Sequence, residues 1–116
     1  MHFKLIIALT EDSITDKIVE AARDKGATGS TVITSARGDG AQVAKTFLGL
    51  SLETQRDVVL LLVEEHVSRE ILEAIEITGK FEDNPGSGIA FSIEVEDAVG
   101  ISHQISQLSA IVEKEI

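Results

Sequence analysis

Two glycine-rich stretches hold the residues of this chain that are best suited to binding a ligand. Gly38 and Gly40 stand where a predicted strand ends; glycines there permit positive φ angles and let backbone N–H groups approach a ligand. A second glycine-rich turn, residues 84–88, follows Thr78–Lys80 at the end of a predicted helix. An ordinary turn explains each stretch equally well, and neither is a dinucleotide fingerprint or a P-loop. The sharper interpretation is that the two turns share one ligand.

Side chains that could perform catalysis or bind a metal show no comparable pattern. His2, His66 and His103 lack ligand spacing, and the absence of cysteine excludes disulfides and thiolate chemistry. Carboxylates are plentiful, but nothing marks a pair as acid and base, and no G-x-S-x-G nucleophile motif occurs. We therefore expect no metal site and no enzyme activity. A small hydrolase has only the carboxylates and glycines in its favour.

The composition limits the remaining functions. The chain has 116 residues, 43% of them hydrophobic, which suits one globular domain over residues 1–116. Its formal net charge of −10 repels phosphate backbones, so we expect no nucleic-acid partner. The amino-terminal apolar run is too short for a signal peptide or a membrane span. A cytoplasmic location is therefore the default expectation.

Hydrophobic patterns place the two turns between alternating strands and helices. Apolar and β-branched runs predict strands over residues 3–9, 30–37, 57–63 and 88–95. Apolar residues at helical spacing predict helices over about 13–25 and about 67–79, each ending at a glycine. From Ile101 to Ile116 the apolar residues recur at intervals of three and four, which predicts a C-terminal helix over about 102–115.

This order of elements indicates the fold class. A strand–helix–strand unit, a long loop and a second strand–helix–strand unit form the split βαβ, ferredoxin-like architecture of the α+β class. Its two helices cover only one face of the sheet, while the predicted strands are apolar on both faces. We therefore predict that self-association buries the uncovered face.

The loop between the second and third strands, about residues 38–56, is unusually long. Connections longer than about 12–15 residues in a compact domain are usually functional or disordered, although an excursion that packs on its own domain is the alternative. Val43, Ala44, Phe47 and Leu48 predict one face of a short helix within the loop. We favour a functional loop.

Several stretches resemble P-II-type signalling proteins, in the same order along the chain. Residues 28–42, TGSTVITSARGDGAQ, are similar to the family's TGMTVTEVRGFGRQ. The apolar strand 58–63 with the helical stretch 71–75, the Thr78–Lys80 turn and the VEDAV stretch 95–99 follow. The resemblance covers most of residues 3–101.

This resemblance implies a non-enzymatic regulator. It implies a homotrimer with the sheets facing inward and a small-ligand site between subunits, usually for adenine nucleotides such as ATP, ADP or AMP. It also implies a long loop that docks on a target protein, such as a membrane transporter or an enzyme, in nitrogen or other nutrient regulation. The ligand-binding residues that it implies are Thr31, Gly38, Gly40, Gln42, Gly79, Lys80 and Gly88. The partner-binding residues expected in the loop are Val43, Lys45, Phe47 and Leu48.

The chain also departs from the family's pattern. Ile89 stands where the family usually has Lys, and Gly100 and Ser102 replace the expected arginines. Those cations would neutralise a polyphosphate, so their absence predicts weaker binding of ATP. The alternative function is a structural or adaptor homotrimer without a small ligand.

Overall fold

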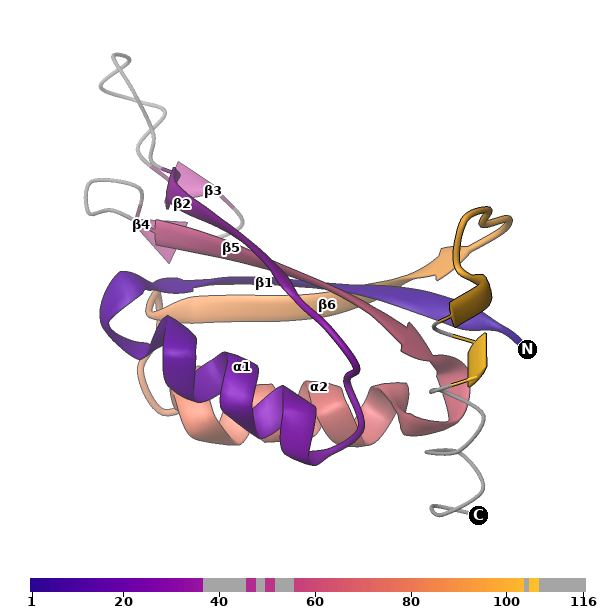
Figure 1. Cartoon of the computed structure of the whole chain (residues 1–116). Helices are drawn as coiled ribbons and strands as arrows, with labels where there is room; N and C mark the ends of the chain where they lie inside the picture. Colours follow the sequence, from indigo (N-terminus) through magenta and orange to yellow (C-terminus); the bar gives the residue numbers. More distant parts are fainter. Residues whose placement is uncertain (37–45, 48–49, 52–55, 104, 107–116) are drawn as a thin grey trace.

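In the described part of the chain, a four-stranded antiparallel sheet with two helices on one face forms the main body of the protein (Figure 1). The computed structural model describes residues 1–36, 46–47, 50–51, 56–103 and 105–106. Across the sheet the strands are ordered β2 (Thr31–Ala36), β5 (Arg56–Glu64), β1 (Phe3–Glu11) and β6 (Gly88–Val95). The helices are α1 (Thr15–Asp24), which follows the 3-10 turn η1 (Asp12–Ile14), and α2 (Glu65–Gly79). The predicted α+β, ferredoxin-like fold is confirmed.

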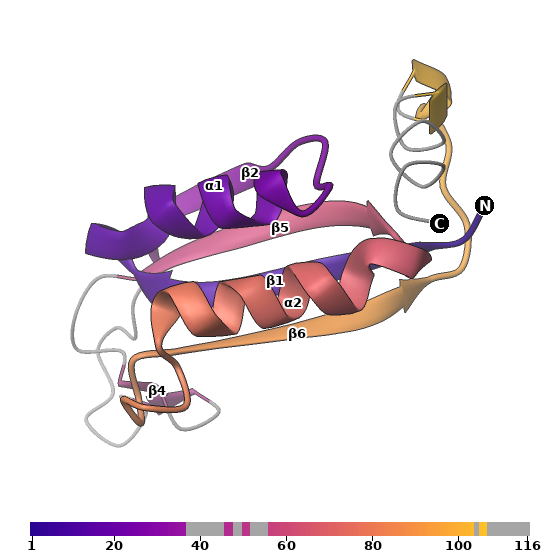
Figure 2. The same ribbon diagram turned by 90° about the horizontal axis from the view of Figure 1, so that it is seen from below.

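The core lies between the sheet and the helices. Figure 2 shows α1 lying along β2 and β5, and α2 lying along β1 and β6. Aliphatic side chains fill the space between these layers, as expected for a chain with four phenylalanines and no other aromatic residue. The largest fully buried apolar side chains are Ile6, Ile18, Leu61, Ile71 and Ile75.

The register of the strands separates the two faces of the sheet. Residues directly opposite one another in neighbouring strands share a face. Ile6 pairs with Leu61, and both are buried beneath the helices. The alternate residues form the other side, which we call the open face. Its apolar residues are Phe3, Leu5, Ile7 and Leu9 of β1, Ile33 of β2, Val58, Leu60 and Leu62 of β5, and Ile89, Phe91, Ile93 and Val95 of β6.

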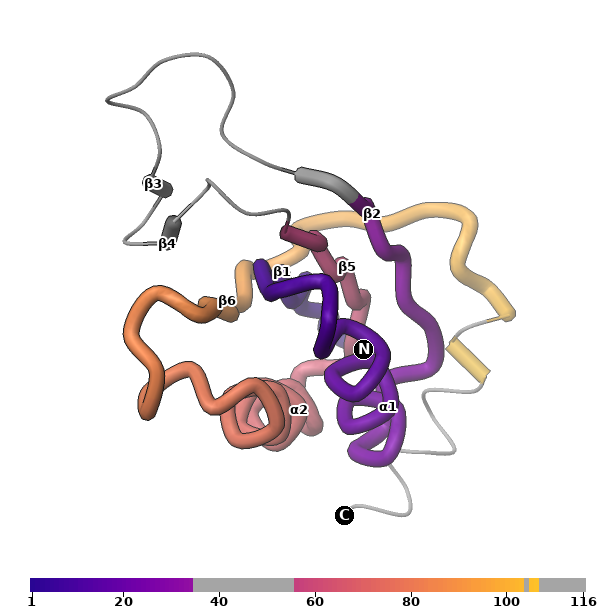
Figure 3. Tube along the Cα trace, turned by 90° about the vertical axis from the view of Figure 1, so that its left-hand side faces the viewer, coloured from indigo at the N-terminus to yellow at the C-terminus, as the bar shows by residue number. Residues whose placement is uncertain are grey.

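No helix among the described residues covers the open face (Figure 3). Ile33 and Ile93 remain 49% and 47% exposed, and most of the other open-face residues are half-buried. The strands are thus apolar on both faces, as the sequence predicts, but one chain buries only one face completely.

Helix α2 begins two residues earlier than the sequence predicts. Its N-cap is Glu64, whose Oε2 accepts a hydrogen bond from the backbone N–H of His66 at 2.7 Å. Ser68 lies inside the helix, where its hydroxyl donates to the Glu65 carbonyl at 2.8 Å. None of the helices in the described part of the chain is long and apolar enough to cross a membrane.

The prediction of a short helix within the long loop is wrong at Phe47, which lies in a strand. Residues Thr46–Phe47 (β3) and Leu50–Ser51 (β4) pair as an antiparallel two-stranded sheet, with Phe47 opposite Leu50. Threonine and phenylalanine both favour strands, and so short a helix would be costly to nucleate. Val43, Lys45 and Leu48 lie outside the described residues.

The predicted C-terminal helix is described only at its beginning. Residues 102–103 and 105–106 are helical, and the backbone N–H of Ile105 donates to the Ile101 carbonyl at 3.0 Å. Residues 107–116 lie outside the described part of the chain, so the extent of this helix stays a prediction.

Candidate functional site

The turn between α2 and β6 brings together three of the residues that were predicted to bind a ligand. Gly79 is the last residue of α2, Lys80 is its C-cap, and Gly88 is the first residue of β6. Lys80 adopts the left-handed conformation, with φ 54°. Helices often end with a glycine in that conformation, but here the glycine stands one residue earlier.

The ring of Phe81 explains the positions of both glycines. Phe81 is 8% exposed and packs in the core. A Cβ atom at Gly79 or at Gly88 would lie 2.2 Å from Phe81 Cε1, far inside van der Waals contact. The missing side chains therefore make room for the ring, and the two glycines have a structural role that is independent of any ligand.

A pocket of about 510 Å³ lies beside the turn, between it and the beginning of α1. Lys17 from α1 and Lys80 from the turn line it, together with Glu11 at the end of β1. Ser87 also lines it, and the Ser87 Oγ atom is buried with no hydrogen-bond partner in the described part of the chain. The two lysines suit an anionic ligand. We call this the turn pocket.

Arg56, the first residue of β5, anchors the turn to the sheet. Its Nη1 donates to the Ser87 carbonyl at 2.5 Å and its Nη2 to the Gly86 carbonyl at 2.9 Å. The Glu11 carboxylate lies 3.8 Å from Nη1, and the Arg56 side chain is 3% exposed. Sequence reasoning treated Arg56 only as the end of the long loop. The one sequence feature that could have drawn attention to Arg56 is its position, a charged residue at the start of a strongly apolar strand.

The other predicted ligand residues lie elsewhere. Thr31 pairs with Leu60 in the sheet and lines a separate pocket of about 240 Å³ with residues 28–30 and Leu62. Within the described part of one chain, Thr31 and Lys80 therefore do not share a pocket. Gly38, Gly40 and Gln42 lie outside the described residues.

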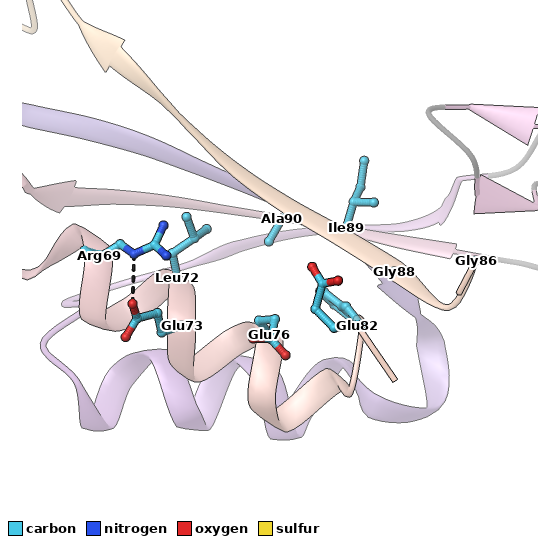
Figure 4. Close-up of a pocket in the computed structure, with 10 residues that line it drawn as sticks. Arg69, Leu72, Glu73, Glu76, Glu82, Gly86, Gly88, Ile89 and Ala90 are labelled. Atoms are coloured by element: carbon cyan, nitrogen blue, oxygen red, sulfur yellow. Dashed lines mark hydrogen bonds and ion pairs between the residues drawn. The ribbon is translucent and has the colours of Figure 1, made fainter. Parts of the chain in front are cut away.

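A cleft of about 470 Å³ separates α2 from β6 (Figure 4). Glu76 from α2 and Glu82 from the turn line it, and Arg69 at one end forms an ion pair with Glu73, with Nε 2.9 Å from Oε1. The carboxylates outnumber the cation, so this cleft repels phosphate groups. Of the two cavities that adjoin the turn, the turn pocket is the better site for an anion.

Glu64, Glu65 and His66 are a group that offers potential metal ligands within 4.8 Å of one another. Both Glu64 oxygens, however, already contact His66, one at the backbone N–H and the other at Nδ1. Metal sites in proteins usually draw their ligands from several elements, whereas these residues are consecutive. We assign them to capping of α2.

Comparisons with known proteins agree with this fold. The model of the family "Nitrogen regulatory protein P-II" matches residues 3–104. A PII-like signalling protein from Thermus thermophilus is 24% identical, with a TM-score of 0.60 over 82% of this chain and 87% of that one. No match was found among curated proteins.

Two structures of CPII from Thiomonas intermedia K12, a nitrogen regulatory PII-like protein, are also similar. The apo form is 15% identical, with a TM-score of 0.61 over 82% of this chain and 90% of that one. The form bound to ADP, AMP and acetate is 17% identical, with a TM-score of 0.58 over 83% and 90%. At such identities the solved structures show a shared fold.

Proposed function

Because the chain belongs to the P-II family, whose members are regulatory signalling proteins rather than enzymes, we propose that it is a homotrimeric regulator that binds a small effector. The effector is an adenine nucleotide held in the clefts between subunits. The long loop, residues 38–56, then controls a target protein, a membrane transporter or an enzyme, in nitrogen or other nutrient regulation.

The turn pocket is the observation that carries effector binding. It is lined by two lysines, Lys17 and Lys80, from different elements. Charge-assisted hydrogen bonds to phosphate are among the strongest that side chains make. Lys17 is also a cation that the family resemblance did not suggest, and it offsets part of the loss of cations at Ile89 and Gly100.

The open face supports the trimer. It presents a continuous apolar surface from four strands, and its edge residues Ile33 and Ile93 are about half exposed in one chain. Soluble proteins rarely leave so extended an apolar surface in water. Packing open faces against one another removes this area from solvent.

Calorimetric titration with ATP, ADP and AMP tests this function. We expect at least one nucleotide to release or absorb heat with the wild-type protein, and Lys80→Gln to weaken its affinity about tenfold because a charged hydrogen bond is lost. Lys25→Gln is the matched control, since Lys25 is exposed at the end of α1. No heat with any of the three nucleotides would contradict effector binding.

The alternative is a structural or adaptor homotrimer without a small ligand. One observation favours it: the Phe81 ring accounts for Gly79 and Gly88 without any ligand. A variant without residues 102–116 separates the two functions. Its nucleotide binding is measured by the same titration and its oligomer mass by light scattering. Loss of assembly in the truncated protein would make the C-terminal segment structural, whereas a trimer that never binds nucleotide would favour the adaptor.

A further inference from the structure

Arg56 is a buried cation with an unusual set of partners. It is the first residue of β5 and pairs in the sheet with Glu11 on one side and with Ala36 on the other. The ends of β1 and β2 thus meet at Arg56. A buried guanidinium is costly unless its donors are satisfied, so the groups that it contacts show what holds it in place.

Its two Nη atoms reach consecutive carbonyls of the turn between α2 and β6. They donate to Ser87 at 2.5 Å and to Gly86 at 2.9 Å, about thirty residues away in sequence. The planar guanidinium presents its donors as a rigid fork, and two neighbouring carbonyls match that fork. Gly86 has φ 85°, a conformation that side chains rarely adopt, so the turn is shaped to direct this carbonyl.

Inside the turn, the backbone hydrogen bonds are short-range. Asn84 N–H donates to the Lys80 carbonyl and Ser87 N–H to the Asn84 carbonyl, both at 3.0 Å. These bonds close the turn on itself but do not fix its position on the sheet. Three contacts hold it there: the Phe81 ring in the core at the beginning of the turn, the Arg56 fork near its end, and the pairing of Gly88 with Thr10 of β1.

We propose that Arg56 is the positioning residue of the turn pocket. The backbone of Gly86 and Ser87 lines that pocket, and the same two residues accept from Arg56. The guanidinium therefore sets where the Ser87 hydroxyl lies relative to Lys80. Arg56 also stands where the long loop returns to the sheet, so a ligand that shifts the Gly86 and Ser87 carbonyls acts directly on that junction.

The ligand in this proposal rests on the proposed function, whereas the anchoring of the turn by Arg56 does not depend on it. The variant Arg56→Lys tests the anchoring and the effect on ligand binding. Lysine keeps the charge but is a point donor that cannot hold two carbonyls as a fork. In the ligand-free protein we expect amide hydrogen exchange at Asn84 and Ser87 to accelerate about tenfold, as for a lost charged hydrogen bond. Arg23→Lys, an exposed arginine of α1, is the matched control and leaves both rates unchanged.

Nucleotide titration of the same variants gives the second readout. We expect Arg56→Lys to weaken the binding of ATP, ADP or AMP about tenfold, and Arg23→Lys to bind as the wild type does. Unchanged exchange at Asn84 and Ser87 in Arg56→Lys would overturn the proposal. Faster exchange with unaltered nucleotide affinity would also overturn it, because the turn would then move without affecting the pocket.

The proposal can still be tested in two other cases. If no nucleotide binds the wild-type protein, the proposed function fails, and hydrogen exchange alone decides whether Arg56 positions the turn. If Arg56→Lys does not fold, nitrogen NMR of the wild-type guanidinium takes its place. Separate Nη1 and Nη2 signals are expected for a guanidinium whose fork is held by two carbonyls, and one averaged signal would contradict the proposal.

Discussion

Both faces of the sheet carry apolar side chains from several strands, but the two faces differ in what covers them. Leu61 and Leu60 are neighbours on β5 and identical in type. Leu61 is buried beneath the helices, whereas Leu60 lies on the open face, only half-buried in one chain. A continuous apolar run therefore predicts burial on both faces of a strand, but it does not say whether the covering residues belong to the same chain.

This difference separates folding from assembly. The covered face packs against α1 and α2, so it determines the stability of one chain. The open face has no such partner among the described residues, and we propose that it packs against other copies of the chain. Substitutions on opposite faces of the same strand should then alter different properties.

A charge on the open face should have the largest effect, complete loss of assembly. Leu60→Glu places a carboxylate at the proposed subunit interface, where desolvation opposes burial of the charge. Light scattering should give three times the chain mass of 12.4 kDa for the wild type and one chain mass for the variant.

The matched control is Ile77→Glu, on the outer side of α2, where Ile77 is 69% exposed. This variant should keep the trimer mass. A wild-type protein that is monomeric at micromolar concentration, or a Leu60→Glu protein that stays trimeric, would contradict the assignment of the open face.

On the covered face, Leu61→Ala should lower the free energy of unfolding by about 2–5 kcal/mol, because it removes buried methyl groups and leaves a cavity. Urea denaturation measures this loss. Leu61→Met nearly conserves volume and should cost less than about 1.5 kcal/mol. A loss below about 1.5 kcal/mol for Leu61→Ala would mean that this face is less tightly packed than the burial of Leu61 indicates.

At the end of α2, Gly79→Ala tests the fit of the Phe81 ring. Alanine gains about 0.5–1 kcal/mol in helix propensity, but overpacking against a buried ring costs about 1–3 kcal/mol. We therefore expect a net destabilisation of about 1–2 kcal/mol, which Phe81→Leu should partly relieve in the double variant. Gly29→Ala is the control, since a Cβ there meets no atom of the described residues within 4 Å. A more stable Gly79→Ala protein would contradict this packing.

The smallest effect is expected on the surface, away from both faces of the sheet. Arg69 and Glu73 form an exposed i,i+4 pair on α2. Such pairs contribute about 0.2–0.5 kcal/mol, less when the cation precedes the anion, and salt screens them. A double-mutant cycle with Arg69→Ala and Glu73→Ala, measured at low and high salt, should give a coupling in this range. A salt-independent coupling above about 1 kcal/mol would indicate a stronger pair.

Local sequence patterns were sufficient to predict most elements of the fold. Residues 57–63 predict β5 because an uninterrupted apolar run is typical of a central strand, and the structure adds only one residue at each end. Gly26 ends α1 as predicted, with φ 115°. The start of α2 was predicted two residues too late, because Glu64 caps the helix through a geometry that only the folded chain provides.

The candidate site could be predicted only in part, because it depends on contacts between distant residues. The motif Thr78–Lys80 indicated the turn that lines the candidate site, but nothing local connects Phe81 with Gly88 or Arg56 with Gly86 and Ser87. Lys17 was missed for the same reason: it precedes the turn by some sixty residues and reaches the pocket only because α1 lies beside it. The apolar pattern of a strand predicts which residues are buried. Which residues line a site depends on how distant parts of the chain pack together.

Limited proteolysis tests most directly whether an effector at the turn pocket acts on the long loop. The purified protein is digested with and without saturating ATP, ADP or AMP, and cleavage within residues 38–56 is followed by mass spectrometry. We expect at least one nucleotide to change the cleavage rate in this segment in the wild type, and to do so far less in Lys80→Gln. Identical cleavage with and without all three nucleotides, in a protein that binds one of them by calorimetry, would contradict the proposed regulation.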